Sequence, residues 1–175
     1  MEVRDLYSYI RAVPDFPKPG VNFYDITPLL ENREAFQLII NKLAEPYEGE
    51  VIDKVVGIDA RGFLLAAPLA FFLGCGLSIV RKKGKLPFRT FSQEYELEYG
   101  SDTIEMHEDT IIEGEKIIIV DDVLATGGTM KATVDLIHQF NAEIVGISFL
   151  AELAYLHGKE KIAHYPIYSL LTFDE

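Results

Sequence analysis

The stretch from Lys116 to Phe140 decides the fold of this chain, and it reads KIIIVDDVLATGGTMKATVDLIHQF. The apolar run Ile117–Val120 is rich in β-branched residues, which is typical of a strand buried on both faces in a parallel sheet. Two carboxylates, Asp121 and Asp122, follow it. We therefore predict a buried strand that ends at a pair of acids.

The residues after the acids predict a turn and then a helix. Ala125–Thr129 is a turn of small residues, and apolar side chains follow it at helical spacing: Met130, Val134, Ile137 and Phe140. A strand, a glycine turn and a helix in this order aim backbone N–H groups and a positive helix end at a phosphate. The turn lacks the lysine of a triphosphate-binding P-loop, and the chain has no G-x-G-x-x-G dinucleotide fingerprint.

The side chains around this turn narrow the ligand to a sugar phosphate. Thr126 and Thr129 supply hydroxyl groups. Asp121 and Asp122 would repel a phosphate unless they accept hydrogen bonds from ligand hydroxyls or face a divalent cation. A monophosphate with a neighbouring diol meets both demands, which favours a sugar phosphate bound with Mg2+. The alternative is an ordinary strand–turn–helix whose glycines only permit an unusual backbone angle.

The nine residues Asp121–Thr129 (DDVLATGGT) resemble the phosphoribosyl pyrophosphate (PRPP) motif of the type I phosphoribosyltransferases. This resemblance implies that Asp121 and Asp122 accept hydrogen bonds from the ribose 2′- and 3′-hydroxyls and offset positive charge on the sugar. It also implies a set of residues that hold the 5′-phosphate through backbone amides and hydroxyls: Ala125, Thr126, Gly127, Gly128 and Thr129.

A second strand end carries polar groups before a predicted helix. Val51–Ile58 is predicted as a buried strand, and Asp59-Ala60-Arg61-Gly62 follows it. Open α/β sheets bind ligands at the carboxyl ends of their strands, so Arg61 is a candidate anion-binding residue, with simple solvation as the alternative. The turn resembles the pyrophosphate loop of the family, which assigns Arg61 and the Ala60–Arg61 peptide to that group.

A cluster of cations begins at a third strand end, after the predicted strand Leu77–Val80. The chain has a net charge of −12, and a local positive patch in such a chain can steer a polyanion to its site. A solvated basic loop is the alternative. Because RKKGKLP also resembles the family sequence here, we expect phosphate contacts, across the interface of a homodimer, from Arg81, Lys82 and Lys85.

Two segments are predicted to border the site. Val3–Val13 has the spacing of an amphipathic helix, and Pro14–Pro28 is proline-rich and aromatic, so we expect it to be rigid and irregular. Composition leaves a packing arm and a binding-site wall equally open. Resemblance to the adenine-using members of the family favours a wall, a small hood mainly of residues 1–30. The implied base-binding residues are Asn22, Phe23, Tyr24 and Val123.

The segment Phe88–Asp109 has no helical stripe, and the alternation Thr103–Met106 predicts a short strand. A hairpin that serves as a flexible lid is the interpretation we favour over a plain surface hairpin. Its sequence SQEYELEYG resembles the catalytic loop of the family. The resemblance implies that Glu98 manages the purine proton and that Tyr99 closes over the site.

Composition bounds the class of protein. The 175 residues are 49% hydrophobic and 25% charged, which suits one globular domain (1–175), and the acidic balance argues against a nucleic-acid partner. The single cysteine, Cys75, is expected to be a buried thiol in a reducing cytoplasm, and no secretory signal is visible. Gly62–Val80 is uncharged, but Pro68 and a Gly-Cys-Gly break predict a buried helix and strand instead of a membrane span.

The remaining pattern completes an α/β fold, a mostly parallel twisted sheet with helices on both faces. It predicts a helix, a strand, a short helix and a closing strand over Glu31–Tyr47, Glu143–Ala151, Ala154–Ala163 and Ile167–Phe173. The resemblance implies transfer of the 5-phosphoribosyl group of PRPP to adenine, giving AMP and pyrophosphate. The alternatives are a xanthine, guanine or orotate enzyme, or a non-catalytic regulator that senses PRPP.

Overall fold

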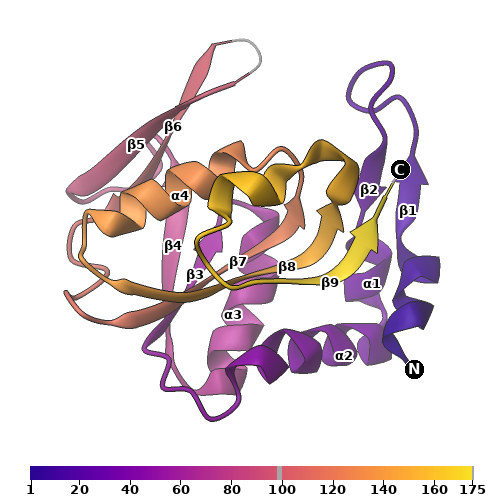
Figure 1. Cartoon of the computed structure of the whole chain (residues 1–175), viewed down its shortest axis with the longest axis horizontal. Helices are drawn as coiled ribbons and strands as arrows, with labels where there is room; N and C mark the ends of the chain where they lie inside the picture. The colour runs from indigo at the N-terminus through magenta and orange to yellow at the C-terminus, as the bar shows by residue number, and fades with distance from the viewer. Residues whose placement is uncertain (98–99, 175) are drawn as a thin grey trace. The chain divides into compact units, whose positions relative to one another are not determined.

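This computed structural model describes residues 1–97 and 100–174, and Figure 1 traces the chain. The chain divides into two compact units, Met1–Lys42 and Leu43–Glu175. The first unit contains the residues for which a hood is predicted, and the second contains the large sheet. The prediction of one domain over 1–175 stays a prediction.

The first unit begins with a short 3-10 helix and a two-stranded antiparallel ribbon. Its elements are η1 (Val3–Tyr9), β1 (Arg11–Val13), β2 (Phe23–Asp25), α1 (Thr27–Glu31) and most of α2 (Arg33–Ala44). The predicted helix Val3–Val13 is therefore wrong beyond Tyr9. Val13 precedes a proline, which disfavours helical backbone, and it pairs with Phe23 in the ribbon instead.

The prediction that Pro14–Pro28 is wholly irregular is wrong at its end. Phe23–Asp25 forms β2, and α1 begins at Thr27 with Pro28 in its first turn, where the missing N–H of proline has no intrahelical partner to lose. Before β2 the chain is irregular, with Gly20 at a φ of 84°. The Phe16 and Phe23 rings pack edge to face, with their centroids 5.2 Å apart, and this contact joins the irregular segment to β2.

The second unit is built on a seven-stranded sheet of order β5-β6-β4-β3-β7-β8-β9 (Figure 1). Neighbouring strands from β4 to β9 are parallel, whereas β6 pairs antiparallel with both β4 and β5. The predicted mostly parallel sheet is confirmed. The strands are β3 (Lys54–Ile58), β4 (Gly76–Lys82), β5 (Thr90–Glu96), β6 (Ser101–His107), β7 (Lys116–Leu124), β8 (Glu143–Leu153) and β9 (Ile167–Phe173).

The central strand β7 is longer than the apolar run predicted. It continues through both acids to Leu124, because β8 extends alongside it and pairs with Asp121 through Phe149 and with Val123 through Ala151. The expectation that the strand ends at the acids is thus wrong. The acids are part of the sheet, and this fixes their backbone more firmly than a loop would.

Helices flank the sheet. Helix α3 (Arg61–Leu73) packs against β3, β4 and β7, and α4 (Gly128–His138) packs against β5, β6 and the 3-10 turn η4. Gly62–Val80 is a helix and a strand, as predicted, and Gly74 ends the helix at a φ of 70°. Within residues 1–97 and 100–174, every helix is too short or too polar to cross a membrane.

The connections differ from prediction in detail. The predicted helix Glu31–Tyr47 is α2 followed by the 3-10 turn η2 (Glu45–Tyr47). The predicted helix Ala154–Ala163 is two 3-10 turns, η3 (Ala154–Leu156) and η4 (Gly158–Ile162), because His157 between them takes a left-handed φ of 55°. Cys75 is half-buried, not buried, since it sits in the turn before β4.

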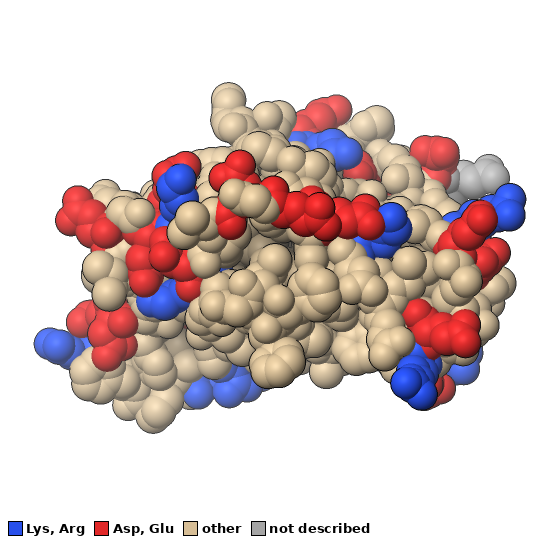
Figure 2. Space-filling model, turned by 90° about the horizontal axis from the view of Figure 1, so that it is seen from below, with Lys and Arg blue, Asp and Glu red and all other residues tan. Residues whose placement is uncertain are grey.

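The charged surface mixes both signs. On the face drawn in Figure 2, Lys and Arg side chains stand beside Asp and Glu side chains. A nucleic-acid partner of the bulk electrostatic kind needs a concentrated basic face. The prediction that the chain has no such partner stays a prediction.

Candidate functional site

The loop after β7 forms a small pocket at the start of α4. Gly127, at a φ of 78°, is the N-cap of α4, and no side chain caps the helix end. The loop therefore presents backbone N–H groups, at the positive end of an eleven-residue helix, to the space in front of it. The pocket measures about 100 Å³ and is lined by Asp121, Val123, Leu124, Ala125, Thr126, Gly127, Gly128, Thr129, Met130 and Phe149.

All five residues predicted to hold the 5′-phosphate line this pocket. The volume suits a phosphate group, and the helix end favours negative charge there. The acids stand on the strand that leads into it, with Asp121 in the lining and Asp122 turned to the other face of the sheet, as strand geometry requires.

Asp122 is nearly buried, at 5% exposure, and it meets the start of α3. Its Oδ2 lies 2.8 Å from Nε of Arg61, and its backbone N–H donates to Oδ1 of Asp121 at 2.9 Å. A Cβ at Gly62 would lie 2.8 Å from Oδ1 of Asp121 and 3.2 Å from the Val120 carbonyl oxygen. Only a glycine lets α3 approach β7 this closely, and the approach carries Arg61 to Asp122.

The two neighbouring carboxyl groups are electrostatically strained. Burial, and then the carboxylate of Asp122, raise the pKa of Asp121 well above its usual range, while the guanidinium of Arg61 acts in the opposite direction. A ligand that offers hydroxyl donors or positive charge to this pair would relieve the strain.

A second, larger pocket adjoins the first. It measures about 280 Å³ and includes Thr129, which also lines the phosphate-sized pocket. Its lining comes from the ends of β3 and β4 and from the β5–β6 hairpin: Ile58, Asp59, Val80, Arg81, Lys82, Tyr95, Leu97, Asp102, Ile104 and Thr129. The adjoining pockets could hold a molecule with a phosphate at one end and a second anionic group at the other.

Each cation predicted to bind the diphosphate is paired with a carboxylate in this structure. Oδ2 of Asp59 lies 3.3 Å from Nε of Arg81 and 3.4 Å from Nζ of Lys85. Nζ of Lys82 lies 3.2 Å from Oδ2 of Asp102. Nε of Arg61 lies 2.8 Å from Oδ2 of Asp122, on β7. A diphosphate that binds these cations would either share them with the carboxylate oxygens or replace those oxygens.

The groups beside Asp59 and Asp102 in this pocket shift the pKa values of these two acids. Burial pushes the pKa of Asp59 upward, but hydrogen bonds from Arg81 and Lys85 outweigh burial and lower it overall. The pKa of Asp102 is lowered first by the backbone N–H of Thr103 and then by the Lys82 side chain. Both carboxylates are thus stabilised as anions.

Sequence reasoning missed these two acids as site residues. Asp59 had a usable signal, because it directly follows a predicted strand and precedes Arg61 at the sheet edge. Asp102 had none, since it is one of several acids in a polar hairpin. Its place is set by pairing, with Asp102 opposite Tyr95 in the β5–β6 ladder.

The predicted hairpin is confirmed, with β5 and β6 antiparallel over their whole length. Tyr95 and Leu97, at its far end, line the larger pocket. Glu98 and Tyr99, the predicted proton-managing and closing residues, lie outside the described residues. Their roles, and the lid role of the hairpin, stay predictions.

The predicted base-binding residues are divided between the two units. Asn22 is exposed beside β2, and Phe23 and Tyr24 lie on β2, with Tyr24 nearly buried. Val123 lies on β7 and lines the phosphate-sized pocket. Their shared role stays a prediction.

Comparison with known proteins identifies the class. The sequence matches the phosphoribosyl transferase domain family over residues 25–171, which is most of the chain. The chain belongs to the phosphoribosyltransferase family.

The relatives bear a more specific name. A protein of Geobacter metallireducens named adenine phosphoribosyltransferase is 54% identical over 169 residues, covering 97% of this chain and 99% of its own. The crystal structure of adenine phosphoribosyltransferase from Thermoanaerobacter pseudethanolicus has a TM-score of 0.95 and 47% identity, covering 98% of this chain and 100% of its own. That from Saccharomyces cerevisiae, complexed with an imino-altritol bisphosphate and adenine, has a TM-score of 0.92 and 39% identity, covering 97% and 98%.

Proposed function

We propose that this chain is an enzyme that transfers the 5-phosphoribosyl group of PRPP to adenine, giving AMP and pyrophosphate. The observation that carries the proposal is the pair of adjoining pockets, one phosphate-sized at the Ala125–Thr129 loop and one with cations on its lining. PRPP has the matching form, a ribose with a monophosphate at one end and a diphosphate at the other. The names of the relatives support adenine as the acceptor.

The described residues suggest how PRPP is held. Backbone N–H groups and hydroxyls of Ala125–Thr129 bind the 5′-phosphate, and Asp121 and Asp122 accept from the ribose hydroxyls. Arg81 and Lys82, which line the larger pocket, bind diphosphate oxygens, and Arg61 and Lys85, which pair with neighbouring acids, add positive charge.

The reaction then needs no covalent intermediate with the protein. A nitrogen of adenine attacks C1 of the ribose as the bond from C1 to the diphosphate oxygen breaks, and the electron pair leaves with pyrophosphate. The chain contributes positioning and charge stabilisation at both ends of the substrate. In this scheme Glu98 takes the purine proton and Tyr99 closes the site, while Phe23 and Val123 flank the ring beside Asn22 and Tyr24.

The donor set suits a magnesium ion that arrives with PRPP. Among the described residues no three His, Cys, Asp or Glu side chains gather into a metal site. Oδ2 of Asp122 is buried and makes no hydrogen bond, although Arg61 lies beside it, so the acid pair can accept nearby positive charge. When bound, Mg2+ supplies neutralisation of the leaving diphosphate.

A homodimer is part of the proposal, and the outer face of α3 supports it. Leu64 is 48% exposed, Phe71 is 90% exposed and Phe72 is 56% exposed. Large apolar side chains that cluster on one helix face indicate a protein interface. Light scattering should show a dimer for the parent protein and a monomer for the Phe71→Glu variant. A monomeric parent protein would contradict the proposed homodimer.

The cytoplasm stays the predicted location.

The test of the function is a comparison of bases. Pyrophosphate release from PRPP is measured with adenine, guanine, hypoxanthine and xanthine in parallel, and we expect release with adenine. Preference for another purine would replace adenine as the acceptor. PRPP binding without release for any base would instead indicate a PRPP-sensing regulator.

A further inference from the structure

The phosphate-binding loop is in backbone contact with a turn far along the chain. A Cβ at Gly127 would lie 2.4 Å from the carbonyl oxygen of Gly158. In the other direction, a Cβ at Gly158 would lie 2.2 Å from the carbonyl oxygen of Ala125 and 2.9 Å from the Gly127 nitrogen. The obstacles are backbone atoms on both sides, so a flexible side chain cannot move aside to make room.

The Gly158 turn is itself held down beside the sheet. Nζ of Lys159 lies 2.8 Å from Oε2 of Glu152, whose side chain is 9% exposed. Glu152 lies on β8 directly opposite Leu124, the last residue of β7 before the loop. The ion pair therefore ties the turn to the part of the sheet from which the loop emerges.

The charge on Glu152 is maintained by this contact. Burial pushes its pKa upward, and the hydrogen bond with Lys159 is the largest of the influences that lower it overall. The pair is half-exposed on the lysine side, so its energetic contribution to the fold is small. Its geometric effect is larger, because the residue directly before Lys159 is Gly158, the glycine that contacts the loop.

We propose that the Gly158 turn, anchored by Lys159 and Glu152, is a positioning element for the 5′-phosphate. It touches neither substrate nor reacting atoms; it holds the backbone of Ala125–Gly127 in the shape that points the N–H groups into the pocket. This inference rests on the proposed function, because it assigns the loop to the phosphate of PRPP. It predicts that changes at the turn alter phosphate affinity and leave diphosphate affinity alone.

The first experiment substitutes the glycine. Gly158→Ala should raise KM for PRPP and Kd for AMP by about ten- to hundredfold, since a small displacement of a binding loop has effects of this size. Binding of pyrophosphate alone, measured by calorimetry, should stay at the parent value, because its cations lie in the other pocket. Weakening of both ligands equally would mean general loosening of the fold and would overturn the inference.

A matched glycine controls for packing. A Cβ at Gly146, which lies on β8, would lie 2.8 Å from Oη of Tyr47. Gly146→Ala should lower the melting temperature and leave KM for PRPP unchanged. If the control raised KM as much as the Gly158 variant, stability and not positioning would explain both.

The lysine supplies a test that does not depend on a crowded backbone. Lys159→Met should raise KM for PRPP several-fold with little change in kcat, and Lys159→Arg should restore it. Parent-like PRPP and AMP affinity in both Gly158→Ala and Lys159→Met overturns the inference; if Gly158→Ala does not fold, the lysine pair decides alone. A parent protein that binds neither PRPP nor AMP would instead refute the proposed function.

Discussion

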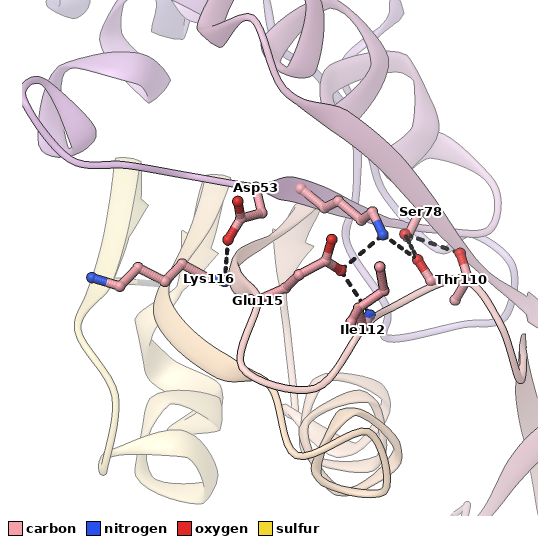
Figure 3. A network of polar contacts seen from close by, with 7 residues as sticks. Asp53, Ser78, Thr110, Ile112, Glu115 and Lys116 are labelled. Carbon is pink, nitrogen blue, oxygen red and sulfur yellow. Dashed lines mark hydrogen bonds and ion pairs between the residues drawn. The ribbon is translucent and has the colours of Figure 1, made fainter.

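The amino and carboxyl ends of the parallel strands differ in how completely their charged groups are paired. At the amino ends of β3 and β7, Nζ of Lys54 donates to the Thr110 carbonyl oxygen at 2.7 Å and to Oε2 of Glu115 at 2.8 Å (Figure 3). The same oxygen of Glu115 accepts from the backbone N–H of Ile112 at 2.8 Å. Lys54 and Glu115 therefore each have both an opposite charge and a backbone partner within the chain.

At the carboxyl ends the balance is incomplete. Asp121 and Asp122 are adjacent, and burial and mutual repulsion raise the pKa of Asp121. Oδ2 of Asp122 lies 2.8 Å from Nε of Arg61 but makes no hydrogen bond. This difference indicates that the charged groups at the amino ends of β3 and β7 stabilise the sheet. The groups at the carboxyl ends, in contrast, gain their full set of partners only when a ligand binds.

The strongest way to break the comparison is to remove both acids of the site. Asp121→Ala with Asp122→Ala should lower the rate of AMP formation by about a thousandfold or more, because groups that stabilise the developing charge are lost. Circular dichroism should show an intact fold. AMP formation at the parent rate would refute the assignment of the PRPP site.

The second way is to remove the ion pair between Lys54 and Glu115 at the amino ends of β3 and β7. Lys54→Met should lower the free energy of unfolding by about 1–3 kcal/mol, because it leaves the half-buried Glu115 without its ion pair. Urea unfolding measures this, and kcat per folded molecule should not change. The matched control is Lys116→Met, whose side chain points away from the network in Figure 3. Equal destabilisation by both variants would show that the network contributes nothing specific.

The third way is to relieve the strain at the site. A carboxyl group whose folded pKa is raised contributes stability below its unfolded pKa and loses it as pH rises through the folded pKa. Asp121→Asn should therefore melt about 2–4 °C above the parent at neutral pH, with the gap closing near pH 4, about the unfolded pKa. Thermal melts across pH test this; a parent protein that stays the more stable at neutral pH would contradict the raised pKa.

The smallest expected effect comes from removing the ion pair between Lys82 and Asp102 of the β5–β6 hairpin. Asp102→Asn removes the charge that pairs with Lys82 at 3.2 Å and can still accept from the Thr103 N–H. Pyrophosphate should bind about two- to fivefold tighter at low salt, because an exposed ion pair of this kind is weak. Calorimetry gives the affinity, and Lys82→Met in the same background should abolish the gain. Unchanged or weaker binding would mean that the pair does not compete with the diphosphate.

Local patterns in the sequence were enough to predict the central strand, the glycine turn and α4. The apolar run before Asp121, the small residues of Ala125–Thr129 and the helical spacing after them each depend on near neighbours in the chain. The same holds for the division of Gly62–Val80 into helix and strand. Short-range steric and hydrophobic preferences, together with family resemblance, thus located the phosphate loop.

Long-range pairing decided the rest. The extension of β7 through its acids requires β8 beside it, the role of Asp59 requires Arg81 and Lys85 beyond the next helix, and the contact of Gly127 with Gly158 joins distant segments. The sequence by itself determined the central strand, the glycine turn and α4, and which chemical groups they carry. Which carboxylate faces which cation, and which backbone supports the phosphate loop, came only from the tertiary structure, because those contacts depend on how the strands are ordered in the sheet.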